Sequence, residues 1–183
     1  MKRLLVPAAL TSMLAACAVQ PIPLHDRAAE SYQVPFQKLI VDNLSTESKI
    51  GVNDVVYVNG WAPAHSGFKP PLNESFVSKI KNSIVANGES GRVDVSVLRV
   101  GFFIEKNVAD DVVFVGLFMA GRERGFKCDA DVNVKTERDS QRITLTHEIR
   151  RSYFDNQEQI RQFIETCQTD LIRQLADSIK KAM

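Results

Sequence analysis

The sequence has almost no net charge. Its 23 lysines and arginines are matched by 22 aspartates and glutamates, which leaves a formal charge of +1 at pH 7. Proteins that bind nucleic acid concentrate positive charge to contact phosphates, and a chain with evenly mixed charges shows no such surface. We therefore expect no nucleic-acid partner and no electrostatic attraction to anionic lipid.

The motifs of most enzymes and metal sites are also missing. There is no Cys-x-x-Cys pair, no zinc-spaced histidine and cysteine cluster, no Gly-x-Ser-x-Gly turn, no glycine-rich phosphate loop and no EF-hand loop. Of the histidines, only His147 falls in phase with the inward side chains of a predicted strand. A lone inward histidine is more often a core residue than a base, so we expect no enzyme, cofactor or metal. The alternative is a hydrolase that joins His147 to a carboxylate and a hydroxyl.

The apolar run at the start of the chain is too short to span a bilayer as a helix. It extends from Leu4 to Met13 and follows the basic pair Lys2-Arg3, a pattern typical of a secretion signal. The next four residues, Leu-Ala-Ala-Cys at 14–17, resemble the lipobox of bacterial lipoproteins. The resemblance implies a signal peptide over residues 1–16 that is cleaved before Cys17.

The same resemblance implies that Cys17 carries the lipid. Several acyl chains on one residue anchor a protein stably where a single chain does not. Ala18 rather than Asp follows the cysteine, which by resemblance favours the outer membrane, with the domain facing the periplasm. The membrane is then one partner, contacted through the lipid. The alternative is an ordinary secretory signal with a fortuitous cysteine.

Cysteine is scarce, and two of the 3 cysteines remain when Cys17 is set apart. Cys128 lies on the apolar side of an alternating strand, and Cys167 lies on the apolar stripe of a helix. Two inward cysteines on neighbouring elements can form a disulfide in an oxidising compartment. The pair Cys128 and Cys167 is therefore a candidate disulfide, and two unpaired buried thiols are the alternative.

The remaining pattern predicts one domain of the α+β class. Residues 17–35 contain three prolines and no sustained period, so we expect a lipidated tether there, followed by a single domain over 36–183. Six strands and two helices are predicted, with Asn73 capping the first helix: strands over 37–41, 53–60, 92–104, 111–120, 126–134 and 142–153, and helices over 74–86 and 156–181. Short links between consecutive strands require antiparallel pairing. We expect a mainly antiparallel sheet with two helices packed on one face.

The junction before the last helix carries a family resemblance. Residues 150–156 read Arg-Arg-Ser-Tyr-Phe-Asp-Asn, and a similar run precedes the last helix of LptE-type lipoproteins. With the lipobox and the element order, the chain resembles small bacterial outer-membrane lipoproteins of the YajG and LptE types. The resemblance implies a curved sheet on two helices. Residues 18–21, Ala-Val-Gln-Pro, depart from the LptE-type start, and a helix cap at Asp155 or Asn156 explains the junction equally well.

One predicted strand suggests a binding surface. Residues 112–119 are apolar at both odd and even positions, so both faces of that strand need cover. Loops of the same chain can supply it; alternatively, a partner does, with Trp61, Phe68, Phe114 and Phe118 as its contact residues. Asp129 and Asp131 are expected on a solvated face. We expect an envelope accessory or assembly module that binds an envelope protein or lipoprotein; the alternative binds lipid or glycolipid in outer-membrane maintenance.

Overall fold

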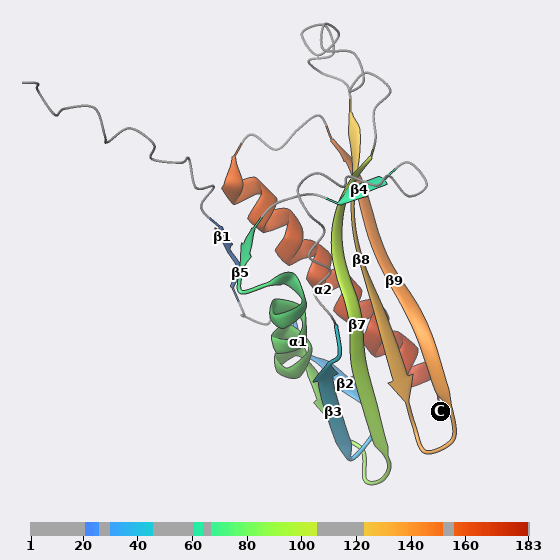
Figure 1. The fold of residues 1–183 in the computed structure, drawn as a ribbon. Helices are drawn as coiled ribbons and strands as arrows, with labels where there is room; N and C mark the ends of the chain where they lie inside the picture. The colour runs from blue at the N-terminus through green and yellow to red at the C-terminus, as the bar shows by residue number, and fades with distance from the viewer. Residues whose placement is uncertain are drawn as a thin grey trace, which may run out of the picture.

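The computed structural model describes residues 21–25, 30–45, 61–63, 67–105, 123–151 and 156–182 (Figure 1). Its elements, in chain order, are β1 (Ile22–Pro23), β2 (Tyr32–Val34), β3 (Lys38–Asn43), β4 (Trp61–Pro63), β5 (Phe68–Lys69), α1 (Leu72–Ser83), β6 (Ile84–Ala86), β7 (Arg92–Glu105), β8 (Arg124–Lys135), β9 (Ser140–Arg151) and α2 (Gln157–Lys181). The predicted strands over 53–60 and 111–120 lie outside the described residues.

Among the described residues, the largest sheet has five strands and is built on the long antiparallel run β7, β8 and β9. Its other two strands both pair with β7: β3 in parallel and β4 antiparallel. A tight turn joins β8 to β9, in which the Thr136 amide donates to the Asp139 carbonyl over 2.8 Å. The pairing of β7 with β8 shifts register between Val97 and Arg99, and such an irregularity bends a strand locally.

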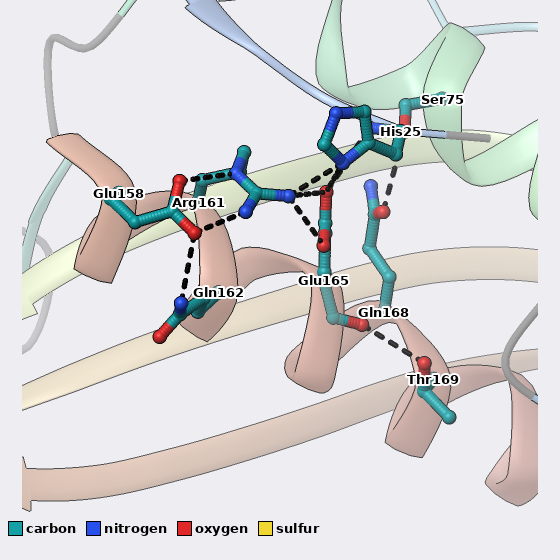
Figure 2. A network of polar contacts seen from close by, with 8 residues as sticks. All are labelled: His25, Ser75, Glu158, Arg161, Gln162, Glu165, Gln168 and Thr169. Atoms are coloured by element: carbon teal, nitrogen blue, oxygen red, sulfur yellow. Dashed lines mark hydrogen bonds and ion pairs between the residues drawn. The ribbon is translucent and has the colours of Figure 1, made fainter. Parts of the chain in front are cut away.

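The core lies between this sheet and the two helices. Alternate residues of β7, β8 and β9 join the apolar stripes of α1 and α2 in one buried cluster, whose members include Val93, Val95, Phe102, Ala130, Val132, Leu145, Phe76, Ile80, Leu171 and Leu175. Between the helices, buried Ser75 donates its hydroxyl to the amide oxygen of buried Gln168 over 3.3 Å (Figure 2). No helix in the described parts of the chain is long and apolar enough to span a membrane.

Both ends of the first helix differ from the prediction. The helix begins at Leu72, and its N-cap residue, Pro71, makes no side-chain capping hydrogen bond. Asn73, predicted as the cap, lies inside the helix, where its side-chain amide donates to the Ser45 hydroxyl over 2.6 Å. Residues 84–86, predicted as helix, form β6 because they pair with β2. Tertiary pairing thus overrides local helical periodicity there.

The second helix agrees with the prediction. α2 begins at Gln157, one residue from the predicted start, and ends at Lys181 as predicted. The Asn156 side chain accepts a hydrogen bond from the Gln159 amide over 2.9 Å, so Asn156 is the N-cap. This is the usual arrangement for an asparagine at this position.

The α+β class is confirmed, whereas the prediction of a mainly antiparallel sheet holds only for part of the molecule. The pairings β4–β7, β7–β8 and β8–β9 are antiparallel. The pairings β1–β5, β2–β6 and β3–β7 are parallel. Every parallel pairing involves β1, β2 or β3. Each of these strands pairs with a strand that does not directly follow it, and the argument from short links applies only to consecutive strands.

The segment predicted as a tether is extended but packed on the domain. β1 pairs with β5 and β2 pairs with β6. Ile22, Leu24 and Val34 are all buried, with Val34 fully so. Because these side chains bury apolar surface against the domain, residues 21–25 and 30–35 are part of the folded structure.

Candidate functional site

The face of the large sheet that points away from the core carries charged and aromatic side chains. We call this surface the outer face; it consists of Trp61 of β4, Arg99, Gly101, Phe103 and Glu105 of β7, Gly125, Lys127, Asp129 and Asp131 of β8, and Arg142, Thr144 and Glu148 of β9. On β8 these positions alternate with core residues, as the period of a strand requires. The outer face is thus set by the same alternation that builds the core.

Two aspartates at the centre of the outer face are buried. Asp129 is 6% exposed and Asp131 is 7% exposed. Asp131 accepts hydrogen bonds from the Thr144 hydroxyl at 2.7 Å, from Arg142 at 3.1 Å and from Arg99 at 3.3 Å. Arg99 also donates to Asp129 over 3.2 Å. One arginine therefore holds two carboxylates.

The two carboxylates respond oppositely to these surroundings. Burial raises the pKa of Asp129, and the charges of Arg99 and Lys127 only partly offset it. Burial also acts to raise the pKa of Asp131, but the hydrogen bonds from Thr144 and Arg142 and the charge of Arg99 outweigh it and lower that pKa. The Oδ1 atom of Asp129 is buried without a hydrogen-bond partner among the described residues. The difference follows from the number of donors each carboxylate has.

The expectation that Asp129 and Asp131 lie on an ordinary solvated face is wrong. Alternation correctly predicts that they point away from the core. It does not predict that three basic side chains cover them: Arg99 from β7, Arg142 from β9 and Lys127 from β8. Burial on this face is a product of cross-strand contacts, which a single strand's pattern does not contain.

Beside the aspartates, aromatic rings and cations alternate in a row. Lys127 Nζ lies 4.7 Å from the centre of the Trp61 ring and 5.1 Å from the centre of the Phe103 ring. The guanidinium carbon of Arg99 lies 5.6 Å from the centre of the Phe103 ring. These separations are those of cation–π contacts. We call Trp61, Lys127, Phe103 and Arg99 the aromatic row.

Two glycines allow the rings to lie against the sheet. A Cβ at Gly125 would come within 2.8 Å of the Trp61 ring, and a Cβ at Gly101 would collide with the Phe103 ring. Trp61 and Phe103 are both partly exposed. Because both rings pack directly on the sheet at a glycine, the aromatic row is held against the sheet.

The four residues predicted as partner contacts are not all brought together. Trp61 lies on the outer face, opposite Glu105. Phe68 pairs with Ile22 and packs edge-on against core residue Phe102, with ring centres 6.4 Å apart. Phe68 therefore joins the core side of the sheet. Phe114 and Phe118 lie outside the described residues, and so does Cys17, the residue predicted to carry the lipid.

Phe103 and Lys127 were not among the residues predicted as partner contacts. Phe103 lies in a strand whose alternation assigns it to the face opposite Phe102, which was a usable signal. Lys127 carried no such signal, because its role depends on the two rings that flank it. A partly exposed aromatic residue on the outward side of a strand is the feature to search for.

The two candidate disulfide cysteines lie together. Cys128 of β8 and Cys167 of α2 have Cα atoms 6.5 Å apart, and both residues are buried. This separation is within the range that a disulfide spans. Both inward orientations predicted from the sequence are confirmed.

His147 has the inward position predicted for it and a carboxylate partner. Its Nδ1 atom lies 2.6 Å from Asp170 Oδ2 of α2, and its ring centre lies 6.1 Å from that of Phe163. A cleft of about 370 Å³ occurs elsewhere, lined by Pro35, Phe36, Ser90, Gly91, Arg92, Thr136, Glu137, Arg138 and Ala182. His147 is not among these residues. The pair therefore ties β9 to α2, and it is not part of that cleft.

Comparisons with known proteins add little. No family model matches the chain, and no curated protein matches it. A crystal structure of an uncharacterized protein is similar over 85% of this chain and 99% of the other, at 11% identity and a TM-score of 0.40. A similarity at that level carries no argument about fold or function.

Proposed function

We propose that this chain is a lipoprotein anchored in the outer membrane through Cys17, with a domain in the periplasm. The domain acts as an accessory or assembly module of the cell envelope by binding another envelope protein or lipoprotein. Membership of the YajG or LptE type is part of the proposal, supported by the lipobox and by residues 150–156. The proposed binding surface is the aromatic row.

The observation that carries the proposal is the pre-ordered pair of rings on the outer face. Trp61 and Phe103 lie on either side of Lys127 and are packed close to glycines. Tryptophan and arginine, which begin and end the row, dominate binding energy at protein interfaces. Groups already fixed in place lose little conformational entropy on binding. A row with these properties suits a protein partner.

Site-specific photo-crosslinking in intact cells tests this proposal. A photoreactive residue replaces Glu148, which is exposed on the outer face and pairs with Lys127. We expect a defined protein adduct from this position, lost when Trp61→Glu is added. The matched control places the same residue at Val85, which is 46% exposed on β6.

The outcomes separate the alternatives. Equal adducts from both positions, or an adduct at position 148 that survives Trp61→Glu, would count against the aromatic row. An adduct with lipid or glycolipid in place of protein would favour the alternative role in outer-membrane maintenance. Thermal unfolding of Trp61→Glu checks that any loss of adduct is not a loss of fold.

We also propose that Cys128 and Cys167 are joined by a disulfide once the protein reaches an oxidising compartment. Their Cα separation of 6.5 Å supports this. The test is electrophoretic mobility with and without reductant, combined with thiol counting by mass spectrometry of the denatured protein. Two free thiols in protein purified from the periplasm would contradict the bond.

A further inference from the structure

Residues 21–25 are held against the domain by hydrogen bonds and buried side chains. The Ile22 amide donates to the Gly67 carbonyl over 2.7 Å, and the Leu24 amide donates to the Lys69 carbonyl over 2.8 Å. Ile22 is 4% exposed and Leu24 is 6% exposed. Two ladder hydrogen bonds and two buried apolar side chains hold this strap, residues 21–25, against β5.

A polar cluster holds the end of the strap to the second helix (Figure 2). The His25 amide donates to Glu165 Oε1 over 3.1 Å, and His25 Nδ1 lies 3.2 Å from the same oxygen. Arg161 donates to Glu165 over 3.0 Å and also contacts His25 and Glu158. The strap is thus attached on one side to β5 and on the other to the first turns of α2.

In Figure 1, β1, β5 and the start of α2 lie toward the same end of the molecule as β4, and we call it the near end. Trp61 pairs there with Glu105, the last residue of β7. Arg151, the last residue of β9, donates to Gln159 in the first turn of α2 over 2.9 Å. β7 has 14 residues, so at a strand's rise it spans about 45 Å. The far end, at the opposite tip, carries Arg92 and Arg138 beside the cleft.

The distance from the strap to the lipidation residue is bounded by covalent geometry. Four peptide links separate Cys17 from Pro21, and consecutive Cα atoms are about 3.8 Å apart, so the two residues are at most about 15 Å apart. That reach is a third of the length of β7. While the strap is bound to β5, a lipid on Cys17 therefore stays close to the near end and does not reach the far end.

We infer that the near end of the domain, with β1, β5 and the first turns of α2, faces the bilayer surface, and that the strap sets this orientation. The inference rests on the proposed lipidation of Cys17. The long strands then point away from the membrane, with the far-end cleft distal. Trp61 pairs at the near end, so one end of the aromatic row is membrane-proximal and favours a partner that is itself a membrane protein.

Tryptophan fluorescence tests the orientation, since Trp61 is the single tryptophan of the chain. Two reporters are made in a Trp61→Phe background: Lys69→Trp at the near end and Arg138→Trp at the far end, both at exposed positions. The lipidated protein is reconstituted in phosphatidylethanolamine and phosphatidylglycerol vesicles that carry a headgroup quencher. We expect quenching of Lys69→Trp to exceed that of Arg138→Trp at least twofold.

Flotation of the vesicles distinguishes a missing lipid anchor from a wrong orientation. Protein that does not float with the vesicles has no working anchor, which overturns both the proposed lipoprotein function and the orientation. Protein that floats with equal quenching of both reporters overturns the orientation alone. Greater quenching of Arg138→Trp would place the far end at the bilayer and overturn it likewise.

A strap variant tests the cause. Ile22→Asn with Leu24→Asn removes the buried side chains that hold the strap. If the strap sets the orientation, the difference in quenching between the two reporters falls to less than half, while flotation is unchanged. Circular dichroism verifies that the domain remains folded. A full difference in a folded double variant would show that something other than the strap orients the domain.

Discussion

Both faces of β8 contain buried residues, and they are buried by different means. Ala130 and Val132 are fully buried on the core face, and the neighbouring Asp129 and Asp131 are less than 8% exposed on the outer face. The core residues need only apolar neighbours, because hydrophobic burial has no direction. Each aspartate instead needs donors at defined positions, since a buried charge without partners is costly.

Substitutions on the two faces should therefore destabilise the protein for different reasons. On the core face the cost of a substitution scales with the volume removed. On the outer face it scales with the number of hydrogen bonds and charges left without partners. Substitutions on each face can therefore be compared for the size and cause of the destabilisation.

Phe102→Ala is expected to have the largest effect. Phe102 lies on the core face, and its ring centre is 5.6 Å from that of Phe163 and 6.4 Å from those of Phe126 and Phe68. Its removal should lower the free energy of unfolding by about 4 kcal/mol, as for other buried phenylalanines. Urea denaturation measures this. Val85→Ala, at an exposed position, is the control and should change it by less than about 0.5 kcal/mol.

Replacing both cysteines, as Cys128→Ala with Cys167→Ala, tests the link between the sheet and α2. The proposed bond closes a loop with a sequence separation of 39 residues. Its loss should cost about 2 to 4 kcal/mol, mainly because the unfolded chain gains freedom. Thermal unfolding of oxidised and reduced wild-type protein gives the matched comparison. If reductant leaves the wild-type midpoint unchanged, no such bond stabilises the fold.

The two aspartates of the outer face should differ. Asp131→Asn leaves the donors Thr144, Arg142 and Arg99 without a carboxylate and should cost about 2 kcal/mol at neutral pH. Asp129→Asn should cost at least twofold less, because burial already penalises the charge that it removes. Denaturation of both variants under one set of conditions measures the ratio. Equal costs would mean that hydrogen-bond number does not govern this face.

The costs of these two substitutions should depend on pH in opposite directions. The pKa of Asp131 is lowered from 3.8 on folding, so its stabilisation is complete above 3.8 and is lost as the pH falls through the folded value. The cost of Asp131→Asn should shrink in acid. The pKa of Asp129 is raised from 3.8, so the folded state binds the proton more tightly. The cost of Asp129→Asn should therefore shrink as the pH rises above 3.8. Unfolding curves from pH 3 to pH 7 decide the signs.

Lys127→Gln should have a small effect on stability, no larger than that of Asp131→Asn. It removes the cation from between the Trp61 and Phe103 rings, and partly exposed cation–π contacts contribute about 0.5 to 1 kcal/mol each. Partner crosslinking at position 148 should nevertheless fall, because the aromatic row loses its central member. A variant with unchanged crosslinking would restrict the binding surface to the rings.

The parts of the fold predicted from the sequence are those whose signal is local and repeated. The long strands β7 and β9 alternate over many residues, and α2 has a continuous apolar stripe and an asparagine cap. The inward positions of Cys128, Cys167 and His147 followed from the same periods. The outward position of Asp129 and Asp131 did too, but not their burial, because its cause lies on other strands.

By itself, the sequence determined the α+β class, the long strands and last helix, the inward cysteines and the lipobox resemblance at Cys17. These depend on periodicity and short motifs, which a single segment contains. Only the tertiary structure decided that residues 21–25 form a strap, that Phe68 joins the core and that Trp61 meets Lys127 and Phe103 on the outer face. Each of these depends on contacts between segments far apart in the chain, and such contacts leave no period in either segment.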